Sequence, residues 1–426
     1  MRVMKWSMIA LAVAAGTSQM AIASSQDESK GFLEDSKLNV KTRMLYFSRD
    51  FRNNERDANG DRQSRAEETG LGFLGTYESG FTQGTVGFGV DAIGMLGLKV
   101  DSGKGRAGTG LFPTGSDGRS QDDYSKGGAA AKFRISDTVL KVGDQFTALP
   151  VFATDDSRLL PEMAQGGLIT SNEIKGLTLH AGRFTSLTGQ AETNRDSLRL
   201  TEADVLGGTY AFTDSLTTSL YYSKVEDYWR KYYANVNWAL PISDKQGLVF
   251  DFNIYDTKSD GSGKVRAFDG DKLDNRAFSL SAAYNIGAHT FTLAYQKVTG
   301  DGDYAYGVDG GGTVFLANSI ARSDFNAEDE KSWQARYDLN FAEYGIPGLS
   351  FMTRYARGTG ANVAGTNNGK EWERDIDVKY VLQEGPAKDL SFRVRQATYR
   401  SADGVYYGSP SLDELRLIVE YPLSIL

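Results

Sequence analysis

Basic side chains recur at alternate positions in several apolar segments, and they are the groups in this sequence best suited to binding anions. The guanidinium group of arginine binds a carboxylate through two parallel hydrogen bonds, so a series of arginines offers successive carboxylate sites. In an extended strand, alternate side chains point to opposite faces, which separates these groups from the apolar residues between them. The basic residues that alternation places on the polar face are Lys41, Arg43, Lys132, Arg134, Arg354, Lys379, Arg393, Arg395 and Arg416.

Most of these residues lie in the first segment or in the last few, and closure of a barrel would make those segments neighbours. The arginines would then collect on one wall of a pore as a ladder. A single inward arginine more often balances a nearby acid, and the same faces also carry Glu414, Glu420, Asp375 and Asp377. We therefore expect a basic wall that these carboxylates partly neutralise.

The rest of the chain shows the period of two that a membrane-spanning strand requires. In the segment 333–341, Trp333, Tyr337 and Phe341 alternate with polar residues, and the segment 248–256 alternates in the same way. Short turns and long polar stretches separate such segments. The expected external loops are 101–126, 256–275, 299–332 and 357–372. The fold class predicted is all-β, a transmembrane antiparallel β-barrel.

Composition and length agree with a barrel of 16 to 18 strands. The 426 residues include 48 Gly, 22 Tyr, 22 Phe, only 8 Pro and no Cys, as expected for many tight turns and aromatic girdles. The mean hydropathy of −0.39 fits a wide barrel with a polar lumen. A soluble β-sandwich is disfavoured by the length, and a β-helix by the absence of a short repeat. The net charge of −8 argues against nucleic-acid binding.

The N-terminus has the layout of a secretory signal peptide. Arg2 and Lys5 precede an apolar run, and Ala21 and Ala23 supply the small residues that a signal peptidase reads. We predict cleavage after Ala23, which leaves 24–426 as a single barrel domain in the bacterial outer membrane. A transmembrane anchor is the weaker alternative, because the apolar run is too short.

A second candidate element is the segment 144–173, which contains two prolines and shows no long alternation. Wide barrels commonly fold such a loop inward to form a constriction. Asp155, Asp156 and Ser157 would then face the arginine ladder. A plain external loop is the alternative.

Several short stretches resemble the OprD family of substrate-specific outer-membrane channels, also called Occ. The stretches lie across the predicted mature chain, and they are specific only when taken together. They are 32–36, 46–50, 156–162, 181–185, 194–197, 317–319, 323–326 and 421–423. The chain ends in Leu426, whereas many outer-membrane proteins end in Phe.

The resemblance implies a monomeric barrel of 18 strands, with inward loops and an arginine ladder opposite an acidic patch. It adds Arg49 and Arg183 to the pore residues, and Ser323 and Asp324 to the inward loops. Strict alternation would place Arg183 with Leu177 and Leu179, so a bulge or the strand end would have to redirect it. The family's substrates are small molecules with a carboxylate, either basic amino acids or cyclic and aromatic acids. We therefore predict passive, selective uptake of small carboxylates.

Two other functions remain alternatives. One is a general diffusion porin of low selectivity. The other is a hydrolase, because members of the family have at times been described as serine peptidases. Only His180 and His289 could serve as its base, and neither lies near a Gly-x-Ser-x-Gly turn. We expect no enzyme activity, no metal and no cofactor. Outer-membrane lipid and lipopolysaccharide are the expected partners besides the substrate.

Overall fold

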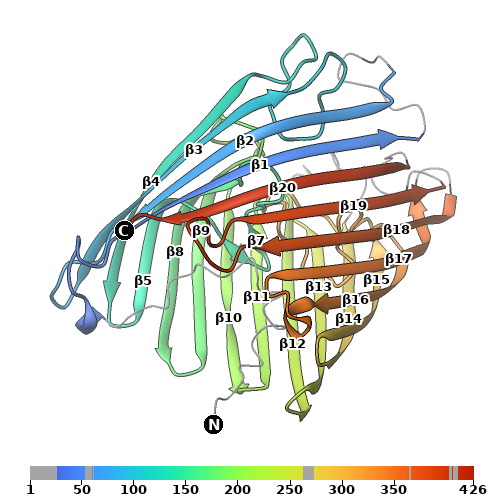
Figure 1. Ribbon diagram of the computed structural model, residues 1–426. Coiled ribbons are helices and arrows are strands. Elements are labelled where there is room, and N and C mark those ends of the chain that lie inside the picture. Colours follow the sequence, from blue (N-terminus) through green and yellow to red (C-terminus); the bar gives the residue numbers. More distant parts are fainter. Residues whose placement is uncertain are drawn as a thin grey trace.

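The computed structural model is a closed antiparallel β-barrel (Figure 1). It describes residues 26–52, 60, 62–261, 273–363, 366–402, 405 and 411–426, so the predicted signal peptide lies outside the described residues. No helix in these ranges is long and apolar enough to cross a bilayer. Eighteen strands form the wall: β1 (Lys37–Phe51), β2 (Arg65–Glu78), β3 (Gly87–Asp101), β4 (Asp123–Ile135), β5 (Thr138–Gln145), β8 (Met163–Ile174), β9 (Leu177–Thr188), β10 (Ala203–Thr213), β11 (Leu216–Val225), β12 (Trp229–Ser243), β13 (Gln246–Ser259), β14 (Asp274–Ile286), β15 (His289–Asp301), β16 (Lys331–Asn340), β17 (Leu349–Val363), β18 (Thr366–Val381), β19 (Ser391–Ser401) and β20 (Leu412–Ser424).

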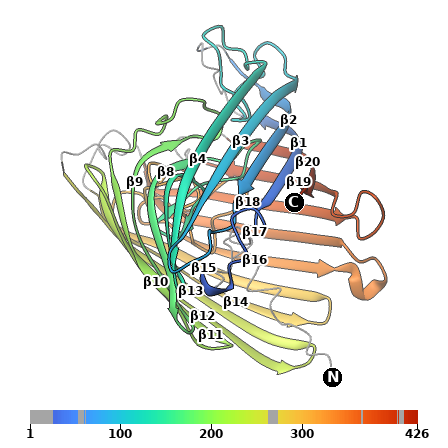
Figure 2. The same cartoon turned by 90° about the vertical axis from the view of Figure 1, so that its left-hand side faces the viewer.

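The first and last strands pair with each other and close the barrel. β1 lies between β2 and β20, and its register with β20 sets Arg43 opposite Glu420 and Phe47 opposite Arg416. Figure 2 shows β1, β2, β19 and β20 side by side on one side of the wall. Closure therefore brings the two ends of the sequence together and leaves no unpaired edge in the main sheet.

Alternation along each strand separates lipid-facing from lumen-facing side chains. On β13, Phe250 and Phe252 are partly exposed on the outside, whereas Asp251, Asn253 and Tyr255 are buried on the inside. Outside the barrel, large apolar side chains such as Leu220 and Leu293 are 67% exposed, as expected for a surface that contacts lipid.

Most of the long connections lie at one end of the barrel, which marks it as the extracellular end. The segment between β3 and β4 and the segment between β15 and β16 are long, as expected. The prediction of a loop at 357–372 is wrong, because β17 and β18 continue through most of it and leave only 364–365 between them. Likewise, β13 extends to Ser259. Alternation is weak in 357–372 because glycine and asparagine replace apolar residues.

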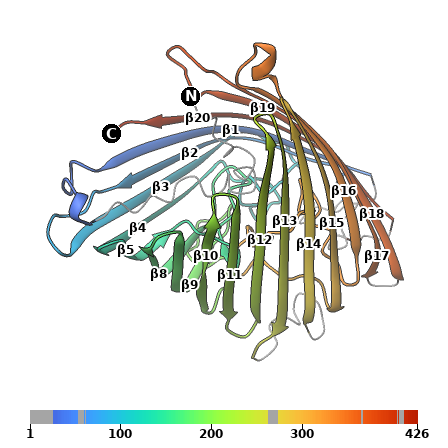
Figure 3. The same ribbon diagram turned by 90° about the horizontal axis from the view of Figure 1, so that it is seen from below.

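Two of the connecting segments fold into the barrel. The first, residues 146–162 between β5 and β8, carries the short hairpin of β6 (Ala148–Leu149) and β7 (Phe152–Ala153). Its Phe152 stacks on Phe184 of the wall, with ring centroids 4.1 Å apart. The second, residues 302–330 between β15 and β16, packs against the first. Figure 3 shows connecting segments inside the wall. We call them the first and second inward loops.

Candidate functional site

The inner faces of β1 and β16 to β20 carry a continuous group of basic side chains. Alternation places them there, because exposed residues such as Phe392 and Val394 occupy the opposite face. Antiparallel pairing then sets the groups close together, with Arg395 opposite Arg416 and Arg336 opposite Arg354. The group, which we call the basic wall, consists of Lys41, Arg43, Arg49, Arg336, Arg354, Lys379, Arg393, Arg395 and Arg416, together with Arg158 of the first inward loop.

Inward carboxylates lie among these cations. Asp377 on β18 accepts from two arginines of β19, Arg393 at 2.6 Å and Arg395 at 3.0 Å. Arg354 pairs with the buried Asp375 at 2.6 Å, and Arg336 pairs with Asp338 at 2.7 Å. Asp377 carries one negative charge and Arg393 and Arg395 carry two positive charges, so this group of three side chains keeps one positive charge.

A second shared carboxylate is Glu414 on β20. It accepts from Arg416 at 2.5 Å and from Arg49 at 3.0 Å, and its own side chain is only 1% exposed. The guanidinium carbons of Arg49 and Arg416 also lie 4.7 and 4.3 Å from the centre of the Phe47 ring. The electron-rich face of an aromatic ring attracts cations, so Phe47 helps to hold two arginines that would otherwise repel each other.

Arg158 joins this group from the first inward loop. Its guanidinium carbon lies 5.3 Å from the centre of the Phe47 ring, and its side chain donates to the hydroxyl of Ser157 at 2.9 Å. Burial, together with the charges of Arg416 and Arg49, lowers the pKa of Arg158. Arg158 lies in the stretch 156–162, and alternation along a strand does not predict the orientation of a residue in a loop. Arg336, by contrast, could have been found by alternation.

Eight of the ten basic groups pair with six carboxylates, and two have no carboxylate partner among the described residues. The six acids are Asp156, Asp338, Asp375, Asp377, Glu414 and Glu420. The two unpaired groups are Arg158 and Lys379. Against the six acids that pair with it, the basic wall therefore keeps an excess of positive charge. Glu371 and Glu373, also on the inner face of β18, accept hydrogen bonds from Ser323 instead.

Asp156 fastens the first inward loop to the wall. Its carboxylate accepts from Lys41 at 2.7 Å and from both terminal nitrogens of Arg43, at 2.8 and 3.1 Å. Arg43 also donates to the carbonyl oxygen of Arg158 and pairs with Glu420 at 2.7 Å. Burial alone would raise the pKa of Asp156, but Arg43 and Lys41 outweigh it and hold that pKa below its usual range. The Asp156 side chain is 43% exposed, so the ion pair of Asp156 with Arg43 lines the open lumen.

The three predicted loop residues therefore do not lie opposite the arginines as a separate acidic patch. Asp156 contacts the wall directly. Asp155 accepts from the backbone and the hydroxyl of Ser157 at 2.8 and 2.7 Å, which stabilises the turn of the loop. The carbonyl of Ser157 in turn accepts from Arg416 at 3.3 Å. Hydrogen bonds from Arg43 and Arg416 therefore hold this part of the loop against the basic wall.

The second inward loop supports the first. Glu162 accepts from the backbone of Gly311 at 2.9 Å, and the backbone nitrogen of Gly312 donates to the carbonyl of Ala153 at 3.1 Å. Lower in the same loop, Asp309 pairs with Lys231 of β12 at 2.7 Å, and both side chains are 0% exposed. These contacts fix how far the two loops reach into the lumen.

Ser323 and Asp324 lie on the second inward loop, as the family resemblance implies, but Asp324 is not an open acid of a patch opposite the arginines. Ser323 is 0% exposed and donates to Glu371 at 2.6 Å, while its backbone donates to Glu373. Asp324 is 8% exposed, accepts from Ser319 at 2.5 Å and also from Tyr306. Burial raises the pKa of Asp324. Its role is to shape the loop, because its oxygens are already occupied.

Arg134 and Lys132 lie inside the barrel but near its periplasmic end, apart from the basic wall. Arg134 donates to Gln26 at 2.8 Å and lies over the Phe81 ring, and Lys132 pairs with Asp91 at 2.7 Å. They help to line a cavity of about 810 Å³ at this mouth. Arg134 is therefore in the periplasmic vestibule rather than on the ladder.

The prediction that Arg183 points into the pore is wrong. On β9 the inward residues are the buried His180 and Phe184, and Arg183 shares the outer face with Leu179. Its side chain is 57% exposed and pairs with Asp204 at 2.7 Å and with Glu202 at 3.1 Å. A bulge does occur, but it follows Phe184 in the chain and does not turn Arg183 inward.

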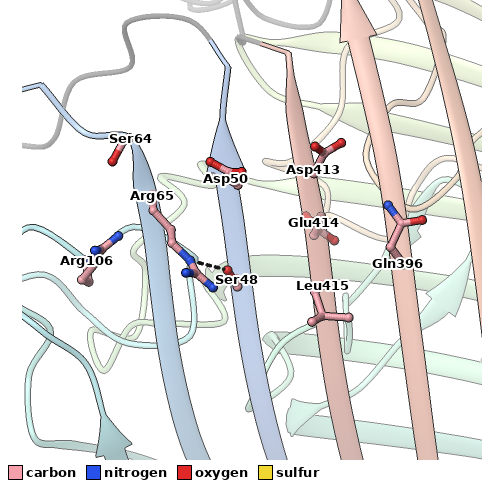
Figure 4. Close-up of a pocket in the computed structure, with 9 residues that line it drawn as sticks. All are labelled: Ser48, Asp50, Ser64, Arg65, Arg106, Gln396, Asp413, Glu414 and Leu415. Atoms are coloured by element: carbon pink, nitrogen blue, oxygen red, sulfur yellow. Dashed lines mark hydrogen bonds between the residues drawn. The ribbon is translucent and has the colours of Figure 1, made fainter.

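A cavity of about 450 Å³ lies where β1, β2, β19 and β20 approach the extracellular rim, and Figure 4 shows residues that line it. Its outward residues include Ser48, Asp50 and Gln396, and Arg65 donates to Ser48 at 3.0 Å. This cavity is on the outer side of the sheet that carries Glu414 and Arg416 on its inner side. It therefore does not form part of the path between the inward loops and the basic wall.

Both histidines contact tyrosine hydroxyl groups. His180 lies 3.0 Å from the hydroxyl of Tyr221 through Nδ1, and it is buried. His289, on the outer face near a periplasmic turn, contacts the hydroxyls of Tyr337 and Tyr344 at 2.8 and 3.1 Å. Neither arrangement sets a histidine beside a serine and a carboxylate, as hydrolysis by a Ser-His-Asp triad requires.

Comparisons with known proteins identify the family. A family model described as "outer membrane porin, OprD family" matches residues 30–425. Porin D of Pseudomonas aeruginosa is 49% identical, over 100% of both chains. The crystal structure of OccAB1 of Acinetobacter baumannii matches with a TM-score of 0.88 and 34% identity, over 95% of this chain and 100% of that one. The structure of OpdK of Pseudomonas aeruginosa with vanillate has a TM-score of 0.82 and 33% identity, over 92% and 100%. The chain therefore belongs to the OprD family of outer membrane porins, and it is a channel for the uptake of small molecules rather than an enzyme.

Proposed function

We propose that this channel conducts small carboxylates selectively and passively, and that the basic wall selects them where the two inward loops narrow the lumen. The observation that carries the proposal is the excess of positive charge at this point. A carboxylate that enters a narrow pore loses part of its hydration, and guanidinium groups on the wall replace those hydrogen bonds.

Shared acids keep the arginines able to bind a passing anion. A guanidinium group has five N–H donors, and one carboxylate cannot occupy all the donors of two arginines. Arg393 and Arg395 share Asp377, and Arg49 and Arg416 share Glu414. Donors therefore remain for a substrate on Arg393 and Arg395, whose side chains are 33% and 23% exposed, while Asp377 limits its residence time by weakening the local field.

The vertical order of the cations gives a route rather than a single site. From the extracellular side, Arg49 comes first, Arg416 and Arg395 follow, and Arg393 and Lys379 lie nearer the periplasm. A carboxylate can pass from one group to the next without leaving positive potential. Several weak sites in series allow both entry and release, as conduction requires.

The family comparison is compatible with this substrate class. OpdK, which shares the barrel, was solved with vanillate, an aromatic carboxylate. For the present channel, amino acids and cyclic or aromatic acids are the candidates. A general diffusion porin of low selectivity is the alternative outcome, and it would not distinguish a carboxylate from a neutral compound of the same size.

The test is solute uptake into proteoliposomes that contain the purified chain. Each carboxylate is compared with its neutral primary amide, which has nearly the same size, and the panel includes acids with and without a basic group. We expect carboxylate uptake to saturate and to be inhibited by other carboxylates, and amide uptake to be slower. Equal, non-saturating rates for each acid and its amide would show a general porin and contradict the proposal.

A further inference from the structure

Four basic side chains lie together on the outer surface of the barrel, near the extracellular ends of β15 to β18. We call them the outer basic patch: Lys297, Lys331, Arg357 and Lys370. Three of them are exposed and Lys297 is partly exposed. Among the described residues, none of the four has an ion pair.

The outward basic residues on the other side of the barrel are different, because each has an acidic partner. Arg183 pairs with Asp204 on β10, Arg276 with Asp256 at 2.7 Å, and Lys258 with Asp274 at 3.5 Å. In contrast, the described outward residues of β16, β17 and β18 include no acid, and Asp301 on the outer face of β15 forms no ion pair with Lys297. The lack of partners is therefore a local property of the outer basic patch.

The register brings like charges face to face within the patch. Lys297 is directly opposite Lys331 on the neighbouring strand. Residues paired in this way have Cβ atoms roughly 5 Å apart, and like charges at that distance destabilise a sheet. Lys370 lies in the same row, with Thr359 between it and Lys331. An anion bound to this row would remove the repulsion.

A row of aromatic residues lies directly below the patch, toward the membrane centre. On the periplasmic side of Lys297 and Lys331, the next outward residues are Tyr295 and Trp333. They are 43% and 47% exposed. Trp372 follows Lys370 in the same way, and Arg357 is opposite both tryptophans. Exposed Trp and Tyr mark the level of lipid headgroups in a barrel. Arg357 is therefore level with the tryptophans, and the three lysines above them lie at the height of headgroup phosphates in the outer leaflet.

We propose that the outer basic patch binds the phosphorylated glycolipid of the outer leaflet, lipopolysaccharide, through the phosphates of its lipid A part. The lysines and Arg357 supply the charge, and the aromatic row and the apolar surface below it, with Leu293 and Phe291, contact the acyl chains. Charge complementarity favours this occupant over a zwitterionic phospholipid, because the patch carries no acid to pair with an amine.

The test measures binding of bisphosphorylated lipid A to the full chain in detergent micelles by native mass spectrometry. The variant Lys331→Gln/Arg357→Gln removes two cations from the patch. Its matched control, Lys258→Gln/Arg276→Gln, removes one lysine and one arginine from outward positions on adjacent strands where each has an acidic partner. We expect affinity to fall roughly thirtyfold in the first variant, since each of the two basic groups contributes about 1 kcal/mol near anionic lipid. We expect little change in the control.

Two further arms separate the possible ligands. Phosphatidylethanolamine should bind the unaltered chain more weakly than lipid A, and inorganic phosphate at the same phosphate concentration should not displace lipid A. Lys331→Arg should retain binding, because it keeps the charge. Equal losses in the two double variants, equal binding of the two lipids, or displacement by inorganic phosphate would each overturn the proposal. Resistance of the folded barrel to unheated SDS provides the check on folding in every variant.

Discussion

Arg43 of the barrel wall donates to both carboxylate oxygens of Asp156 in the first inward loop, at 2.8 and 3.1 Å. The arginine is only 9% exposed, and it also pairs with Glu420 on the neighbouring strand. One guanidinium group thus links two strands and a loop that lies more than a hundred residues away in the sequence. The contact positions the loop and at the same time sets the charge of the path beside it.

Asp156→Asn should increase the preference for anions. The substitution leaves Lys41 without its carboxylate partner and leaves Arg43 paired only with Glu420. One uncompensated charge in a wet pore contributes on the order of 1 kcal/mol, so the anion-to-cation permeability ratio should rise about fivefold. Reversal potentials across planar bilayers under a salt gradient measure that ratio. Asp204→Asn, which alters an acid on the outer face, is the control, and an equal change in both would contradict the account.

Glu162 should make the contact between the two inward loops sensitive to pH. Burial and the neighbouring Asp155 raise the pKa of Glu162 from the ordinary 4.5 to about 8. A raised carboxyl pKa means that the stabilisation is complete below about pH 4.5 and is lost as the pH rises through 8. We expect more frequent current fluctuations in single channels at pH 8.5 than at pH 5.

The matched variant for this prediction is Glu162→Gln, which has no titrating proton and still accepts a hydrogen bond from Gly311. Its fluctuations should be independent of pH across the same range. If the variant kept the pH dependence of the unaltered chain, Glu162 would not be the responsible group.

The buried pair of Lys231 and Asp309 should anchor the second inward loop. Lys231→Met leaves the carboxylate of Asp309 buried without its cation, which typically costs about 3–5 kcal/mol. Limited proteolysis should then cleave within 302–330 at a lower protease concentration. Lys231→Met/Asp309→Asn removes both charges and should restore much of the resistance.

The exposed pair Lys258–Asp274 supplies the comparison for this anchor. Lys258→Met should leave the cleavage pattern unchanged, because an exposed ion pair contributes little. If cleavage increased equally after Lys258→Met and Lys231→Met, the buried pair would have no special role in holding the loop.

Strand alternation correctly predicted the inner or outer orientation of side chains on the long strands. It placed Lys41, Arg43, Arg393 and Arg416 on the inner face, where the structure has them. It also placed Arg183 with Leu179 on the outer face, and the pore assignment that family resemblance gave to Arg183 was the part that failed. A strand has a fixed period of two, so orientation follows from the sequence alone.

The loops were harder to predict, because no period relates their side chains to the wall. Asp156 was expected to lie opposite the arginines, yet it pairs with two cations of the basic wall. Asp324 was expected to face the pore, yet hydrogen bonds from Ser319 and Tyr306 hold it within its own loop. Arg158 adds a cation that alternation could not have found. Such contacts depend on how two loops pack together inside the barrel.

The measurement that tests carboxylate selection most directly is the permeability ratio of a small carboxylate to potassium in single channels. The variant is Arg158→Gln/Arg395→Gln. It removes two cations of the basic wall, and Asp377 keeps Arg393 as its partner, so no carboxylate loses its only cation. The control is Arg183→Gln/Arg276→Gln, which removes two arginines from the outer face. If the basic wall selects carboxylates, the ratio should fall about thirtyfold in the variant, or ~2 kcal/mol for two charges at ~1 kcal/mol each, and stay unchanged in the control. An unchanged ratio in the variant, or an equal fall in the control, would contradict the account.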